Sequence, residues 1–348
     1  MTPDGAATRR SPPTWLPRRT IRPSADEPPI LLVVVDTEEE FDWNAPFDRF
    51  ATSVRAMGAV DRIQTIFDDH GVRPIYVVDY PVVSQPDGFT RLRAYVHENR
   101  AVVGAHLHPW VSPPFEEEVN RRNSFAGNLP PHLESTKIRL LGDRITETFG
   151  HRPLVYKAGR YGLGPNTASI LEQQGYLVDL SASPTFDYRD EGGPDYSGFS
   201  CHPYWFGTAE QLLGVPNTAA HLGLLGERGA ALHRLAARPA LRWARIPGVL
   251  SRLGIVERLR LSPEGFELDE LQRLTLALLR RGLRVLTLSF HSPSAASGYT
   301  PYVRDEGQRD AFLGRLRDYL AFFLHELGGR TMTPLELRHH LHLEEAVP

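Results

Sequence analysis

The sequence has little of several features that would assign a chain to a class at once. Its single cysteine, Cys201 among 348 residues, excludes an intrachain disulfide and a thiolate metal cluster. No apolar run reaches the roughly 18 residues of a membrane-spanning helix, and no apolar segment of signal-peptide type is present, so we expect a cytoplasmic protein. The 39 basic and 42 acidic residues give a net charge of −3, which argues against a nucleic-acid-binding protein.

The order of apolar and polar segments predicts one α/β domain. Residues 1–27 are rich in Pro, Arg, Ser and Thr and lack periodicity, so we predict a disordered arm there. Residues 28–345 are predicted to form a single domain, because short apolar runs alternate with helical patterns, as in a parallel sheet or barrel. A long insertion is predicted over about 181–262, where this alternation is interrupted. The predicted strands are 30–35, 73–79, 102–108, 154–160, 176–180 and 283–290.

The first of these strands stops abruptly at acidic residues. Ile30–Val35 is followed by Asp36, Thr37 and three glutamates. Polar groups at the carboxyl ends of buried parallel strands lie where α/β proteins build their active sites. Because side chains alternate along a strand, we predict that Asp36 and Glu38 share a face and that Glu39 points away. Two converging carboxylates need a cation or a shared proton to offset their repulsion.

Polar residues follow three further predicted strands. His106 and His108 lie two residues apart, so both imidazoles can face one side, and with a carboxylate they form a set suited to a divalent cation such as Zn²⁺. Arg160 could hold a carboxylate through two hydrogen bonds, and His291 could be a general acid near neutral pH. Each residue also has a structural explanation: a packed histidine, a surface ion pair or a hydrogen-bonded histidine.

Six strings, taken in order, resemble the NodB-homology polysaccharide deacetylases (carbohydrate esterase family 4). The closer likeness is to the WalW-like branch, which is associated with lipopolysaccharide biosynthesis. The resemblance implies a distorted (β/α)7 barrel that removes N- or O-acetyl groups from sugars with the help of a bound metal. The strings are VVDTEEEFDW (34–43), GAHLHPWVSPPF (104–115), NSFAGNLP (123–130), KAGRYGLGP (157–165), GPDYSG (193–198) and LSFHSPS (288–294).

The first two strings carry the implied base and metal ligands. The resemblance implies Asp36 as general base and Glu38 as a metal ligand, in place of the family's usual aspartate. His106 matches the first histidine of the family's H-(S/T)-x-x-H motif. The second histidine of that motif falls at Trp110, so His108 is the nearest substitute ligand.

The remaining strings carry the implied supporting roles. Arg160 matches the arginine that orients the base, and His291 matches the general acid. Asp179 occupies the region of the motif that supports this histidine. Tyr161 and Trp110 could present apolar faces to a sugar ring.

The sequence therefore predicts a Zn²⁺-dependent deacetylase acting on an acetylated sugar or glycan precursor. Two alternatives stay open. Some proteins of this fold hydrolyse cyclic amides without a metal, and the tryptophan at position 110 keeps that reaction in view. The chain could also be a non-catalytic carbohydrate-binding or scaffold protein on an inactive barrel.

Overall fold

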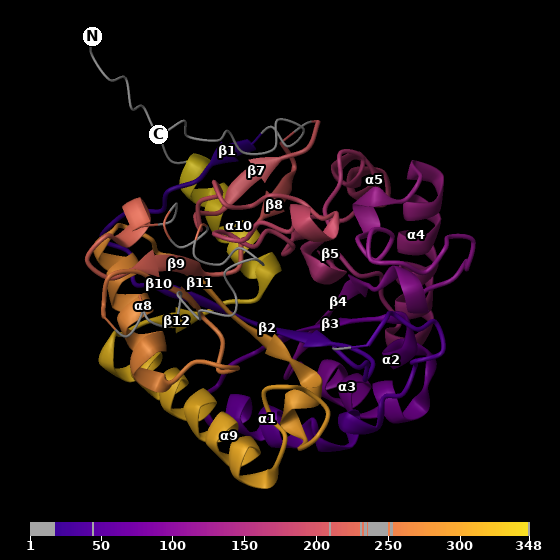
Figure 1. Cartoon of the computed structure of the whole chain (residues 1–348), viewed down its shortest axis with the longest axis horizontal. Coiled ribbons are helices and arrows are strands. Elements are labelled where there is room, and N and C mark those ends of the chain that lie inside the picture. Colours follow the sequence, from indigo (N-terminus) through magenta and orange to yellow (C-terminus); the bar gives the residue numbers. More distant parts are fainter. Residues whose placement is uncertain are drawn as a thin grey trace.

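A ring of parallel strands surrounded by helices forms the body of the protein (Figure 1). The computed structural model describes residues 18–346 apart from 44, 209, 230–231, 233–234, 236–249 and 251–252. Six consecutive parallel pairings join seven strands, which confirms the predicted α/β barrel architecture. In spatial order these are β11 (Val285–His291), β2 (Ile30–Thr37), β3 (Ile75–Val78), β4 (Val102–Leu107), β5 (Val155–Ala158), β6 (Val178–Asp179) and β8 (Leu212–Gly214).

Helices cover the outside of these strands, as the β-α alternation predicts. The ring is distorted where β8 and β11 do not pair directly. The segment after β8 bridges this gap, because the backbone N–H of Asn217 donates to the carbonyl of Ala182 and the side-chain Oγ1 of Thr218 accepts from Thr287 N–H of β11. The helices are α1 (Asp61–Asp69), α2 (Tyr80–Ser84), α3 (Pro86–His97), α4 (Pro131–Phe149), α5 (Thr167–Gln173), α8 (Leu268–Arg280), α9 (Glu306–Ala321) and α10 (Pro334–Ala346). None of these described helices combines the length and the apolar character of a membrane span.

Strand β2 shows how the core is divided. All eight of its residues are buried, and the six apolar ones alternate between two hydrophobic clusters. Leu31, Val33 and Val35 pack outward against the helices, whereas Ile30, Leu32 and Val34 fill the interior of the ring. This alternation decides which side chains reach the mouth of the barrel.

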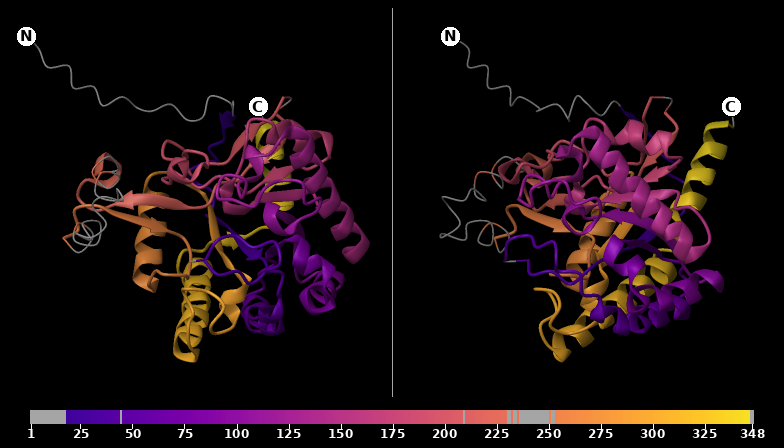
Figure 2. Two further views of the ribbon diagram at one scale, coloured as in Figure 1. Left: turned by 45° about the vertical axis from the view of Figure 1, so that its right-hand side comes forward. Right: turned by 90° about the vertical axis from the view of Figure 1, so that its right-hand side faces the viewer.

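Two predicted segments differ from expectation in their described parts. Residues 1–17 of the predicted arm lie outside the described residues, but β1 (Arg18–Thr20) pairs antiparallel with β7 (Tyr204–Phe206) and is part of the sheet. The predicted insertion supplies the ring strand β8, and it also holds the pair β9 (Ala219–Leu222) and β10 (Glu257–Arg260). These two strands, salmon and orange, project to one side of the ring (Figure 2). A short β12 (Arg330–Thr331) pairs with β2.

Candidate active site

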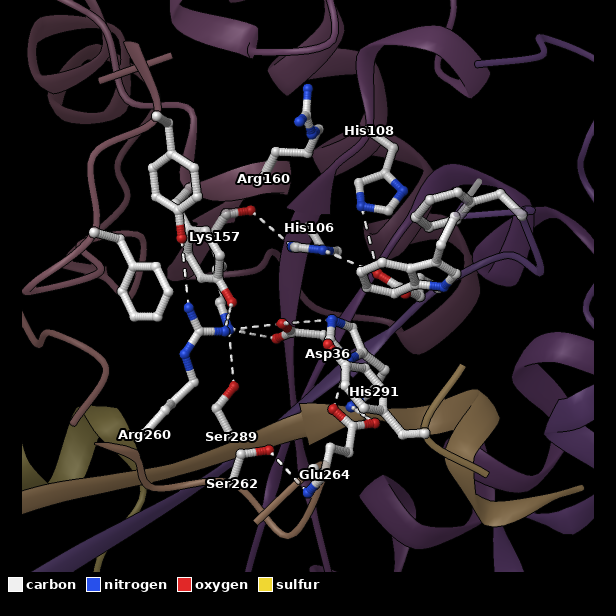
Figure 3. A pocket seen from close by; sticks show the side chains of 18 of the residues that line it. Asp36, His106, His108, Lys157, Arg160, Arg260, Ser262, Glu264, Ser289 and His291 are labelled. Carbon is white, nitrogen blue, oxygen red and sulfur yellow. Dashed lines mark hydrogen bonds and ion pairs between the residues drawn. The ribbon is translucent and has the colours of Figure 1, made fainter. Parts of the chain in front are cut away.

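The interior positions of the ring strands lead directly to a pocket at their carboxyl ends. On β2, Asp36 is the next interior position after Val34, and the turn that follows brings Glu38 to the same side. Corresponding positions on the other strands place His106, Lys157 and His291 in the same pocket, which has a volume of about 580 Å³. Figure 3 shows these side chains converging from separate strands.

Three predicted metal ligands meet at one point. Nε2 of His106 lies 3.6 Å from Oε2 of Glu38, and Nε2 of His108 lies 3.5 Å from the same oxygen. All three side chains are at most 4% exposed. The strand pattern alone does not produce this meeting, because His108 follows the end of β4 and depends on the turn there.

Each imidazole is oriented through its other nitrogen. Nδ1 of His106 lies 3.1 Å from the backbone carbonyl oxygen of Lys157, and Nδ1 of His108 lies 2.8 Å from Oε2 of Glu39. A neutral imidazole that donates from Nδ1 keeps the lone pair of Nε2 free for a cation. Burial lowers the pKa of His108, which favours this neutral form.

Glu39 corrects one expectation, since it does not point away from the site. It is 1% exposed, and its backbone N–H donates to Asp79 Oδ2 at 2.6 Å. Burial raises the pKa of Glu39 to about 8, and burial together with Glu39 raises that of Asp79 well above its usual value. The two acids form a buried support behind His108, of the kind that fixes metal-binding histidines in place.

Asp36 is held by a lysine that the sequence reasoning did not select. Lys157 Nζ donates to both carboxylate oxygens of Asp36, at 2.6 and 2.8 Å, and to Ser289 Oγ at 3.0 Å. Burial raises the pKa of Asp36, but Lys157, together with the smaller contributions of His106 and His291, outweighs burial and keeps the pKa below its ordinary value. Asp36 is therefore an ionised carboxylate at neutral pH.

Arg160 lines the same pocket but does not orient Asp36. It follows β5 in a short turn, where its φ of +53° takes the chain out of the extended conformation. Its guanidinium donates to Ser124 Oγ at 2.6 Å and forms an ion pair with Glu191. Among the described residues, the cation that hydrogen-bonds to Asp36 is Lys157, which occupies an interior position of β5.

His291 is positioned by Glu264, not by Asp179. Nδ1 of His291 lies 2.7 Å from Oε2 of Glu264, and its Nε2 lies 4.0 Å from Oδ2 of Asp36. Burial opposes protonation, but the negative charges of Glu264, Glu38 and Asp36 raise the pKa of His291 to about 9. Asp179 cannot take this role, because its neighbours Val178 and Leu180 occupy the interior positions of that segment. Its carboxylate instead accepts from Ser181 Oγ and Ser181 N–H.

The two aromatic residues predicted to contact a sugar have different surroundings. Trp110 is 2% exposed and stacks on His108, with ring centroids 4.3 Å apart, so it supports a candidate ligand and does not present its face to the pocket. Tyr161 does line the pocket, and its hydroxyl accepts a hydrogen bond from Arg260 at 2.8 Å. Trp43 and Tyr302 also line the pocket beside His291.

The residues present fit a divalent cation. Glu38, His106 and His108 each offer one ligand atom, and these atoms lie within 4.8 Å of one another. Two imidazoles and a carboxylate form a donor set that Zn²⁺ accepts, with further positions left for water or substrate. The Lys157 carbonyl and Glu39 hold the Nδ1 atoms of the two histidines, so both Nε2 atoms point toward Glu38. A metal site needs its ligands oriented in this way.

Comparison of the sequence with protein-family models and with curated proteins finds no match. Solved structures, in contrast, share its fold over nearly the whole chain. A polysaccharide-deacetylase-type protein of Mycobacterium smegmatis aligns with a TM-score of 0.55 at 14% identity, covering 95% of this chain and 96% of that one. One of Pseudomonas aeruginosa PAO1 aligns at 0.52 and 15% identity, covering 92% of each chain. The PuuE allantoinase aligns at 0.51 and 16% identity, covering 90% of each. The chain thus has the fold found in polysaccharide deacetylases.

Proposed function

We propose that this protein is a metal-dependent hydrolase that removes an acetyl group from a sugar or glycan precursor. The observation that carries the proposal is the convergence of His106 Nε2 and His108 Nε2 on Glu38, next to Asp36 and His291. The fold shared with polysaccharide deacetylases supports it. The strings that resemble the WalW-like branch favour a saccharide precursor as substrate, and the donor set favours Zn²⁺ as the metal.

The protein residues account for the proton transfers of such a hydrolysis. Asp36, ionised and fixed by Lys157, accepts a proton from the water that attacks the acetyl carbonyl carbon. His291, kept protonated by Glu264, donates a proton to the departing sugar nitrogen or oxygen as its bond to the acetyl carbon breaks. Glu38, His106 and His108 would hold a divalent cation, which would supply Lewis-acid polarisation of the acetyl carbonyl. The products are acetate and the free amine or alcohol.

Metal content together with a deacetylation assay tests this proposal. The purified protein should release acetate from members of a panel of acetylated sugars, and a chelator should reduce the rate at least about a hundredfold, because a bound metal contributes several kcal/mol to the transition state. Glu38→Ala and His106→Ala should lose both metal and activity. Undiminished hydrolysis by fully metal-free protein would contradict the mechanism.

A metal-independent cyclic-amide hydrolase is the second candidate, and the fold shared with an allantoinase favours it. Trp110, in place of the second histidine of the deacetylase motif, is consistent with this reading. The same metal analysis separates the two, because the cyclic-amide hydrolase predicts turnover of cyclic amides without a metal. The non-catalytic alternative predicts sugar binding without turnover in the presence of metal.

A further inference from the structure

Two arginines of strand β10 line the pocket on the side where Phe186, Tyr188 and Tyr161 lie. Arg258 and Arg260 are two residues apart, so they lie on the same face of β10, and both side chains are half-buried. Glu257, the residue before Arg258, lies on the other face of β10 and pairs with Arg273 of α8. Figure 3 shows Arg260 on the side of Asp36 opposite His108.

Within the described part of the chain, these arginines differ from the other cations of the pocket in having no acidic partner. Lys157 is paired with Asp36, Arg160 with Glu191, and His291 with Glu264. Among the residues that the structure describes, neither Arg258 nor Arg260 has a carboxylate within ion-pair distance, and no hydrogen bond of the Arg258 side chain is found. Arg260 binds three hydroxyl groups, those of Tyr161, Ser183 and Tyr188, and its buried Nε has no partner.

Aromatic rings hold both guanidinium groups in place without neutralising them. The guanidinium carbons of Arg258 and Arg260 lie 3.9 and 4.3 Å from the ring centroid of Phe186. Phe186 in turn stacks on Tyr188 at 5.9 Å, and Tyr188 stacks on Tyr161 at 5.5 Å. A cation over an aromatic face is attracted to it but keeps its N–H donors available. The aromatic rings therefore fix the positions of both guanidinium groups at the wall of the pocket.

Two adjacent positive charges removed from water are costly unless something neutralises them. Burial, and then the charge of Arg260, lowers the pKa of Arg258 to about 10. The lowered pKa shows that the charged form of Arg258 is destabilised in the pocket. An anion between the two guanidinium groups would offset this cost, because arginines bind phosphate and carboxylate oxygens through pairs of hydrogen bonds. The pocket would then hold the anion of the ligand beside the acetyl group that is removed.

We propose that Arg258 and Arg260 bind an anionic group, a phosphate or a carboxylate, carried by the acetylated sugar. This inference rests on the proposed function, since it names the class of substrate for the same pocket. The acetyl group would lie at Glu38, His106 and His108 while the anion lies at β10. The substrates of this protein would then be acidic or phosphorylated sugars, and neutral ones would bind weakly.

Calorimetric binding to the metal-containing protein tests this proposal independently of turnover. The probes are N-acetylglucosamine 1-phosphate, N-acetylmuramic acid and the neutral methyl N-acetylglucosaminide, and the first two distinguish phosphate from carboxylate. At least one anionic sugar should bind about tenfold or more tightly than the neutral one, as expected for a charge-assisted contact. Arg258→Gln should abolish this preference, and Arg258→Lys should retain part of it.

Arg280→Gln is the matched control, because Arg280 is exposed on α8 and its loss changes the net charge equally. Thermal melting of each variant checks that it is folded. Equal binding of neutral and anionic sugars, no binding of any probe, or an anion preference that survives in folded Arg258→Gln would overturn the proposal. If the anion preference depends on Arg258 but no acetate is released, the binding site stands and the deacetylase proposal fails.

Discussion

The two sides of the pocket differ in whether the protein itself supplies a polar partner for the groups that line them. On the side of β2 and β4, the protein supplies an outer partner for each candidate histidine ligand: the Lys157 carbonyl for His106, and Glu39 for His108. On the side of β10, it supplies aromatic faces and leaves the charges of Arg258 and Arg260 without an acidic partner among the described residues. The first arrangement is suited to fixing a metal and transferring protons, and the second to selecting a ligand. Changes on the first side should therefore alter metal content and rate, and changes on the second should alter only which sugar binds.

The largest effect on the rate is expected from a change of Asp36, the proposed base, which lies between the two sides of the pocket. Asp36→Asn should lower kcat about 10²- to 10⁴-fold, because proton transfer by a positioned group contributes that much. It should leave the metal in place, since Asp36 is not one of the three converging ligands. Steady-state kinetics and metal analysis of the same preparation check this. Asp310→Asn, at an exposed ion pair on α9, is the control. Loss of metal from Asp36→Asn would make Asp36 a ligand instead.

A change behind His108 tests whether the outer support matters. Glu39→Gln should weaken metal affinity about 10- to 100-fold, because partners of ligating histidines typically contribute that much. Glu40→Gln is the adjacent control, since Glu40 bonds Ser53 and the backbone of Ala56, not a candidate ligand. Titration with a competing chelator measures both. Equal affinities in the two variants would show that Glu39 does not support the site.

The pH dependence should report the pair formed by His291 and Glu264. His291 acts in its protonated form, so the rate should fall as the pH rises through its pKa, which is about 9. Glu264→Gln removes a nearby negative charge and should shift this alkaline limb about 1 to 3 units toward lower pH. Profiles of kcat against pH for both proteins check the shift. An unmoved limb would mean that another group is the acid.

The smallest effect is expected where the backbone passes close to a ligand. A Cβ on Gly159 would overlap the imidazole of His108 and the carbonyl oxygen of Leu107. Gly159→Ala should therefore cost about 1–3 kcal/mol of unfolding free energy and weaken metal binding. Gly314→Ala on α9, where a Cβ meets nothing within 4 Å, should not be destabilising. Chemical denaturation measures both. A Gly159→Ala variant with unchanged unfolding free energy and metal affinity would show that the site tolerates movement of His108.

Much of the site follows from sequence because strand ends and alternation are local properties. Asp36, His106 and His291 were predicted from apolar runs that end in polar residues, and the structure brings them together. The same alternation would have excluded Asp179, which lies between two interior positions of its segment. The chain has only two lysines among its 39 basic residues, and both are buried. The rarity of lysine is thus the one sequence feature that could have singled out Lys157.

Other parts of the site depend on contacts that no local pattern specifies. Glu264 lies in a loop and reaches His291 across 27 positions, and Glu39 meets His108 across 69. Arg160 follows its strand, but a left-handed backbone conformation turns it toward Glu191. Arg258 and Arg260 belong to the predicted insertion, where the β-α alternation is interrupted, and their place in the pocket comes from the pairing of β10 with β9.

Metal stoichiometry tests the central claim most directly. Elemental analysis of the purified protein, after equilibration with Zn²⁺ and removal of the excess, should find one ion per chain. The ion should be absent from His106→Ala and Glu38→Ala and present in Asp36→Asn and Arg258→Gln. Folded wild-type protein that binds no divalent ion, or folded His106→Ala that binds it as tightly as wild type, would contradict the account.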